Sequence, residues 1–133
     1  SNKVGRRLPA YTTALGKALL AERFGAELDA HIPAALPALT ARTITDRATL
    51  ERALEEARVR GYATDNEENT VGIKCFAVAL RYRNPASDAI SASVPLERLT
   101  PDREREIVEA LRLVCDKVSR VVRPVANGDK WFA

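Results

Sequence analysis

The chain has 133 residues, 46% of them hydrophobic and 29% charged, which fits one globular domain and excludes a disordered or fibrous protein. The net charge is only +3 at pH 7, because 21 basic residues nearly match 18 acidic ones, so the composition does not indicate a nucleic-acid-binding surface. No apolar run approaches the roughly 18 residues of a membrane helix, and the two cysteines cannot build a disulfide framework, so we expect a cytoplasmic protein without membrane contact.

The first half of the chain predicts helices. Residues 13–23 carry an apolar stripe, and one of the two threonines at its start can cap the helix. Residues 25–40 contain two prolines and predict short helical turns rather than one long helix. Thr45 or Asp46 can cap a second helix, and Gly61 is a suitable residue to end it.

The middle of the chain changes to a strand pattern. Residues 71–80 and 89–96 are apolar and β-branched, with turn residues between them, and predict a hairpin. Residues 62–66 are a plausible earlier strand of the same sheet.

A long helix is predicted after the hairpin, because Thr100 and Pro101 are favourable residues at a helix start. Its apolar positions are spaced four, three, four and three. They predict a wide stripe that packs on the sheet, made of Ile107, Leu111, Val114, Val118 and Val121, with Val108, Cys115 and Val122 beside them. The order of elements favours an α+β domain, an antiparallel sheet flanked by helices. Residues 124–133 are expected to form a loose tail.

The strand around Ile90 holds the first candidate binding residues. Strand geometry places Ser91 and Ser93 on one face, and Ile90, Ala92 and Val94 on the other. Two serines add nothing to a core and suit a small polar ligand, whereas the alternative is a strand face that simply meets solvent.

Cys75 lies in the neighbouring predicted strand. It is either an inert buried residue or a nucleophile, and a nucleophile would need a base within hydrogen-bond reach. The single histidine, His31, falls in a loop-like stretch, which disfavours a hydrolase and excludes a His-rich metal site. Asp65 begins an acidic run that is typical of a solvated turn, although one carboxylate at a strand end can orient a ligand.

The start of the first helix is a further candidate. Free backbone N–H groups at a helix start attract anions, so those of Ala14, Leu15 and Gly16 could hold a carboxylate. Gly16 suits either a close ligand or close backbone packing. Lys17 is expected to be a solvated helix residue rather than an anion clamp.

Several motifs, in order along the chain, resemble the effector-binding domain of IclR-family transcription regulators. They begin with Leu-Pro-Ala-Tyr and end with Ala-Ile-Ser-Ala-Ser-Val-Pro, and together they make the resemblance specific. The motifs lie at residues 8–11, 14–21, 43–46, 61–68, 72–75 and 89–95.

The resemblance implies a fold similar to GAF domains, with a pocket for a small organic acid. Matching the family's motifs residue by residue implies that the ligand contacts are Ala14, Leu15, Asp65, Cys75, Ser91 and Ser93. No metal, cofactor or covalent chemistry is implied, so we expect a sensor and not an enzyme. The alternative is a GAF-like thiol enzyme or redox sensor that uses Cys75.

The resemblance also implies the place of this chain in a larger regulator. Residues 4–123 are expected to be an N-terminally incomplete effector-binding domain, because a winged helix-turn-helix, a linker helix and the first strands precede the Leu-Pro motif in the family. DNA contact would come from that N-terminal domain, which this chain lacks. A homodimer or homotetramer is expected, as in the family.

Overall fold

The computed structural model describes residues 8–121. The order of elements is η1 (Ala10–Thr12), α1 (Ala14–Leu20), α2 (Gly25–Asp29), α3 (Arg47–Arg60), β1 (Ala63–Asn66), β2 (Ile73–Leu80), β3 (Asp88–Pro95), η2 (Leu96–Arg98) and α4 (Pro101–Val121). This is the expected α+β fold. The predicted tail at residues 124–133 lies outside the described residues.

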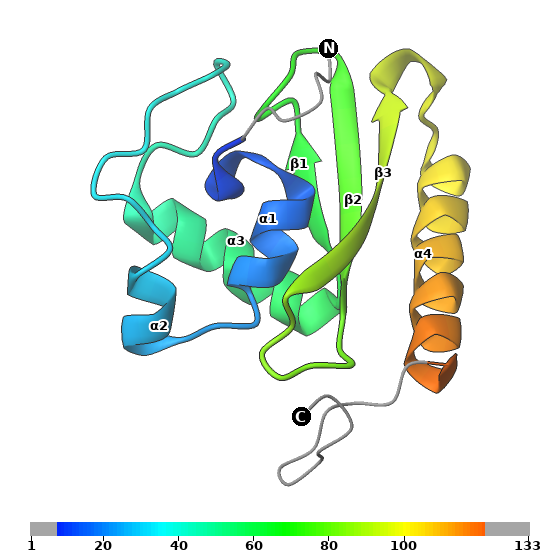
Figure 1. Ribbon diagram of the computed structural model, residues 1–133. Helices are drawn as coiled ribbons and strands as arrows, with labels where there is room; N and C mark the ends of the chain where they lie inside the picture. The colour runs from blue at the N-terminus through cyan, green and yellow to red at the C-terminus, as the bar shows by residue number, and fades with distance from the viewer. Residues whose placement is uncertain (1–7, 122–133) are drawn as a thin grey trace, which may run out of the picture.

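The three strands form one antiparallel sheet in the order β1-β2-β3. The helices cover it in two layers: α1 and α3 lie on one face and α4 lies along the other (Figure 1). Each face has its own apolar cluster, one built mainly from α1, α3 and the loops, the other from β2, β3 and α4.

The ends of α3 show how local sequence sets the elements. The Asp46 side chain accepts a hydrogen bond from the backbone N–H of Thr49 at 2.9 Å, as an N-cap should. Gly61 ends the helix with φ 88°, a left-handed conformation that favours glycine. Both predicted boundaries are confirmed, whereas α1 ends at Leu20, three residues before the expected end.

The long helix α4 packs on the sheet along one side of the predicted apolar stripe. The buried row runs through Val108 and Leu111 to the half-buried Cys115, whereas Val114 and Val121 are 47% and 83% exposed. Successive residues of a helix turn by about 100°, so Val114 points well away from a sheet that Cys115 faces. The expected contacts of Val114 and Val121 are therefore wrong.

Candidate functional site

A cleft of about 700 Å³ lies between the start of α1, the loop after β1, and strands β2 and β3. All six residues that the sequence analysis selected lie on its wall, although they come from four separate segments. The complete lining is Leu8, Ala10, Thr13, Ala14, Leu15, Gly16, Leu19, Asp65, Asn69, Thr70, Ile73, Cys75, Ser91 and Ser93. We call this cleft the serine pocket.

The start of α1 forms one wall of the serine pocket. Thr13 caps the helix, and its hydroxyl accepts the backbone N–H of Gly16 at 2.9 Å. The N–H groups of Ala14 and Leu15 belong to the first turn, and no acceptor for them is found among residues 8–121. These two amides therefore remain available to an acceptor on a ligand.

Gly16 has a packing role. A Cβ at this position would lie 2.3 Å from the carbonyl oxygen of Ala10, a clash with backbone that cannot move cheaply. The absent side chain therefore lets η1 lie directly against α1. Close backbone packing, one of the two interpretations that the sequence left open, is therefore confirmed, and Gly16 also lines the serine pocket.

Asp65 forms the opposite wall, at the end of β1. Its side chain is buried, with the residue 3% exposed, so the interpretation of the acidic run as a solvated turn is wrong at this residue. Oδ1 accepts the backbone N–H groups of Glu68 at 2.7 Å and Asn69 at 3.2 Å, which fixes the loop. Burial raises the pKa of Asp65 above its usual value, although these two hydrogen bonds oppose the shift. No partner for Oδ2 is found among residues 8–121.

The register of the sheet brings the thiol and the hydroxyls together. Cys75 pairs with Ser93 across β2 and β3, and Ala77 pairs with Ser91. The Cys75 sulfur lies 3.2 Å from the Ser93 hydroxyl oxygen. Both serines are exposed, so they face an open cleft rather than a water-free cavity.

The surroundings of Cys75 do not activate a thiol. Burial raises its pKa, and the negative charges of Asp65 and Glu68 add to the shift, whereas a nucleophilic thiol needs a lowered pKa. His31 is absent from the lining of the serine pocket and lies on a separate cleft with Arg23 and Ser87. The interpretation of Cys75 as a nucleophile therefore gains no support from the geometry.

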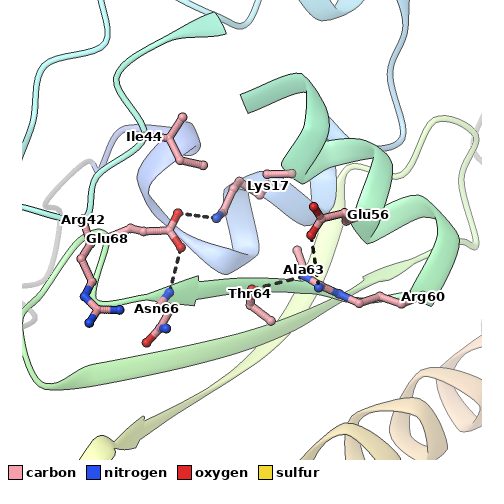
Figure 2. A pocket seen from close by; sticks show the side chains of 10 residues that line it. Lys17, Arg42, Ile44, Glu56, Arg60, Ala63, Thr64, Asn66 and Glu68 are labelled. Atoms are coloured by element: carbon pink, nitrogen blue, oxygen red, sulfur yellow. Dashed lines mark hydrogen bonds and ion pairs between the residues drawn. The ribbon is translucent and has the colours of Figure 1, made fainter. Parts of the chain in front are cut away.

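A second cleft, of about 380 Å³, lies on the other side of α1, and we call it the Lys17 cleft. Figure 2 shows the Lys17 side chain reaching from α1 to the carboxylate of Glu68, with Nζ and Oε1 2.5 Å apart. Lys17 is only 4% exposed and Glu68 only 9%. The expectation that Lys17 is solvated is therefore wrong. Its ammonium group is buried in an ion pair with a carboxylate 51 residues away in the chain.

Some lining residues were missed by sequence reasoning. Asn69 and Thr70 reach the serine pocket because the loop after β1 folds back over Asp65, and Leu19 lies one turn below Leu15 on α1. Asparagine, threonine and leucine are common outside binding sites, so these residues did not stand out in the sequence. Loop folding and cross-element packing place them there.

Residues 8–121 contain neither a cluster of metal-binding side chains nor a membrane-spanning helix. No three His, Cys, Asp or Glu side chains within residues 8–121 gather closely enough to hold a metal ion. No helix in the same range has the length and apolar character needed to cross a membrane.

The fold defines an α+β domain with an open cleft on one face of its sheet, and comparison with known proteins identifies its class. The model of the family described as "Bacterial transcriptional regulator IclR C-terminal" matches residues 1–120. The chain therefore belongs to the IclR family and corresponds to its C-terminal effector-binding domain.

Three relatives illustrate the match. The chain is 44% identical over 103 residues to the HTH-type transcriptional repressor AllR of Klebsiella pneumoniae, covering 75% of this chain and 38% of AllR. The crystal structure of the C-terminal domain of Escherichia coli KdgR has a TM-score of 0.80 at 36% identity, covering 87% of this chain and 72% of that one. The inducer-binding domain of PobR from Acinetobacter, a double mutant in complex with 3-hydroxybenzoic acid, has a TM-score of 0.78 at 27% identity, covering 90% and 70%.

These relatives are named as transcriptional regulators and not as enzymes. The chain spans less than half the length of the curated regulators it matches, 38% to 46% of each.

Proposed function

We propose that the chain senses a small organic acid in the serine pocket and controls DNA binding by a separate N-terminal domain of the complete regulator. The observation that carries this proposal is the meeting, around one cleft, of the hydroxyls of Ser91 and Ser93 with the helix-start amides of Ala14 and Leu15, which have no acceptor within residues 8–121. These groups donate hydrogen bonds, which suits the oxygens of a carboxylate. The acid bound to the PobR domain supports the same ligand class.

Asp65 narrows the ligand class further. An ionised Asp65 repels a bare carboxylate, so we assign its oxygen Oδ2 to a hydroxyl or a hydrated keto group of the ligand. The ligand would then be a hydroxy or oxo acid, with the carboxylate toward α1 and β3 and the hydroxyl toward Asp65.

The signal would be a shift between two arrangements of the regulator. A ligand changes such an equilibrium only as far as it binds one arrangement better than the other. Because ligand binding alone achieves this, no covalent step is required. In the complete protein we place this regulation in the cytoplasm, with DNA contacted by the N-terminal domain.

Assembly into a homodimer or homotetramer is part of the same proposal. Strands β1 and β3 are the two edges of the sheet, and neither has a second partner strand within residues 8–121. An unpaired edge favours pairing with a further strand. Sedimentation at high concentration tests this, and a strictly monomeric chain would contradict it.

A thermal-shift screen tests the binding proposal directly. The panel contains glycolate, lactate, pyruvate and 3-hydroxybenzoate, with acetate as the acid that lacks a hydroxyl or keto group. A ligand at a hundred times its Kd adds about 2.7 kcal/mol to the free energy of unfolding, which raises Tm measurably. If no acid in the panel shifts Tm at high concentration, the proposed ligand class is wrong.

A further inference from the structure

The ion pair between Lys17 and Glu68 joins the two opposite walls of the serine pocket. Lys17 lies on α1, whose first residues Ala14 and Leu15 form one wall. Glu68 lies in the loop after β1, between the lining residues Asp65 and Asn69. The pair itself faces the Lys17 cleft, so it connects the two walls from behind without occupying the serine pocket (Figure 2).

Glu68 is hydrogen-bonded directly to the Asp65 carboxylate. Its backbone N–H donates to Oδ1 of Asp65 at 2.7 Å, and its Oε2 accepts the backbone N–H of Asn66 at 2.8 Å. The hydroxyl of Thr43 donates to the carbonyl oxygen of Glu68 at 2.6 Å. A change in the place of Glu68 therefore moves the loop that holds the Asp65 carboxylate.

A second, neutral bridge runs between the same two parts of the chain. The Asn69 side-chain amide donates to the hydroxyl of Thr12 at 2.9 Å, and Thr12 is the buried last residue of η1, next to the N-cap of α1. Two bridges from neighbouring loop residues, one to Lys17 within α1 and one to Thr12 just before its N-cap, therefore hold α1 at a set distance from Asp65.

Stability alone is a poor explanation for the charged bridge. Burying two charges removes their hydration, and apolar residues of similar volume often stabilise a fold equally well or better. An ion pair instead fixes the distance between its two elements. We propose that Lys17 and Glu68 are positioning residues, which hold the α1 amides and the Asp65 carboxylate at the separation that the ligand requires; this rests on the proposed ligand site.

The test uses three variants of the chain and one matched control. Lys17→Met and Glu68→Gln each break the pair, and the side-chain amide oxygen that Glu68→Gln introduces can still accept the N–H of Asn66. The double variant K17M/E68Q leaves no unpaired buried charge, so it keeps the test possible if a single variant fails to fold. Val108→Ala is the control, because Val108 is buried against α4's face of the sheet and touches neither wall.

The first measurement is the Kd of the panel acids by calorimetric titration, at a temperature where every variant is folded. We expect each single variant to raise Kd about tenfold, since a misplaced wall loses part of a hydrogen-bonded contact. The double variant should raise Kd no further, because the second substitution removes nothing once the pair is broken. Val108→Ala should lose stability and keep the parent's Kd.

The second measurement needs no ligand. Iodoacetamide labelling of Cys75, followed by peptide mass, reports how accessible the half-buried thiol is within the serine pocket. We expect about a threefold or greater increase in rate for both single variants, and none for Val108→Ala. Lys17→Met is the decisive variant, because the negative charge of Glu68 raises the pKa of Cys75, so Glu68→Gln also activates the thiol electrostatically.

The outcomes separate this inference from the proposed function. The positioning role is overturned if Lys17→Met and the double variant match Val108→Ala in both measurements. If the acids bind and neither Ser91→Ala nor Ser93→Ala affects them, the ligand site is misplaced, while the labelling rates still decide the positioning role. If no acid binds at all, the labelling of Lys17→Met decides it alone.

Discussion

The two faces of the sheet are built from side chains of different size, although they alternate along the same strands. On the face toward α1 the cross-strand pairs at the serine pocket include Cys75 with Ser93 and Ala77 with Ser91. On the face toward α4 they include Val78 with Ile90, and Phe76 with Ala92. Small and polar side chains line the first face, and larger apolar ones dominate the second.

The difference separates two tasks within one sheet. Large apolar side chains fill the space between the sheet and α4, where burial of apolar area stabilises the fold. Small side chains leave room for α1 to approach and for the serine pocket to remain open. Substitutions on the α4 face should therefore change stability, and substitutions around the pocket should change binding.

The largest expected effect is on the α4 face. Phe76→Ala removes a fully buried ring and should lower the free energy of unfolding by about 3–5 kcal/mol, measured by urea denaturation. Phe76→Leu, a milder change, keeps enough of the fold for titration with the panel acids. Its Kd should equal that of the parent, and a weakened Kd would show that the two faces are not independent.

The next effect is on the pocket face. Ser91→Ala and Ser93→Ala should each raise the Kd of a bound acid about tenfold, or about 1.4 kcal/mol, since each removes a hydrogen bond to a charged oxygen. Because both hydroxyls are exposed, the free energy of unfolding should hardly change. Titration of both variants, with Ser119→Ala on the exposed side of α4 as control, checks this. Parent-like binding by both would place the pocket elsewhere.

The division between the two faces could be predicted from the sequence because it follows from local rules. Strand alternation separates Ser91 and Ser93 from Ile90, and the register then carries Cys75 to the serine side. The caps of α3 are equally local. That the six expected residues share one cleft could be predicted only with the help of the family resemblance. Spacing along the chain does not show that α1 packs against the sheet.

The errors of the sequence reasoning lie where distant residues meet. Lys17 and Glu68 are 51 positions apart, and nothing near Lys17 in sequence indicates a buried partner. Asp65 is buried because the following loop folds back and donates to it. On α4 the apolar spacing left two neighbouring rows possible, and contact with the sheet selected the row of Val108 over that of Val114.

A smaller effect, on pH dependence, should distinguish Asp65 from an ordinary carboxylate. Its raised pKa means that the folded state binds the proton more tightly, so its contribution to stability is present below the usual aspartate pKa of about 3.9 and is lost as pH rises through the folded value. Asp65→Asn should remove this loss and flatten the profile.

Asp46 provides the matched control for this measurement. Hydrogen bonds from Thr49 lower the pKa of Asp46, so its contribution is present above the usual pKa and is lost as pH falls. Asp46→Asn should therefore change the profile in the opposite direction. Urea denaturation at a series of pH values checks both variants, and changes of the same sign would contradict the assignment for Asp65.

The smallest expected effects are those of replacing the two cysteines, one on each face of the sheet, by serine. Cys75→Ser keeps the size and a polar hydrogen next to Ser93, and burial raises the pKa of the thiol, so the parent is neutral there as serine is. Its Kd should change less than that of either serine variant.

Cys115→Ser instead puts a hydroxyl against the apolar cluster under α4, where the sulfur lies 3.4 Å from the Ala79 carbonyl oxygen. That variant should lose about 1 kcal/mol of stability and keep the parent's Kd, because a partly buried hydroxyl gives up hydration. Titration with the panel acids and urea denaturation of both variants test these expectations. If Cys75→Ser abolishes binding while the fold remains intact, the thiol itself takes part in the site. That result would favour the alternative of a thiol enzyme or redox sensor that uses Cys75.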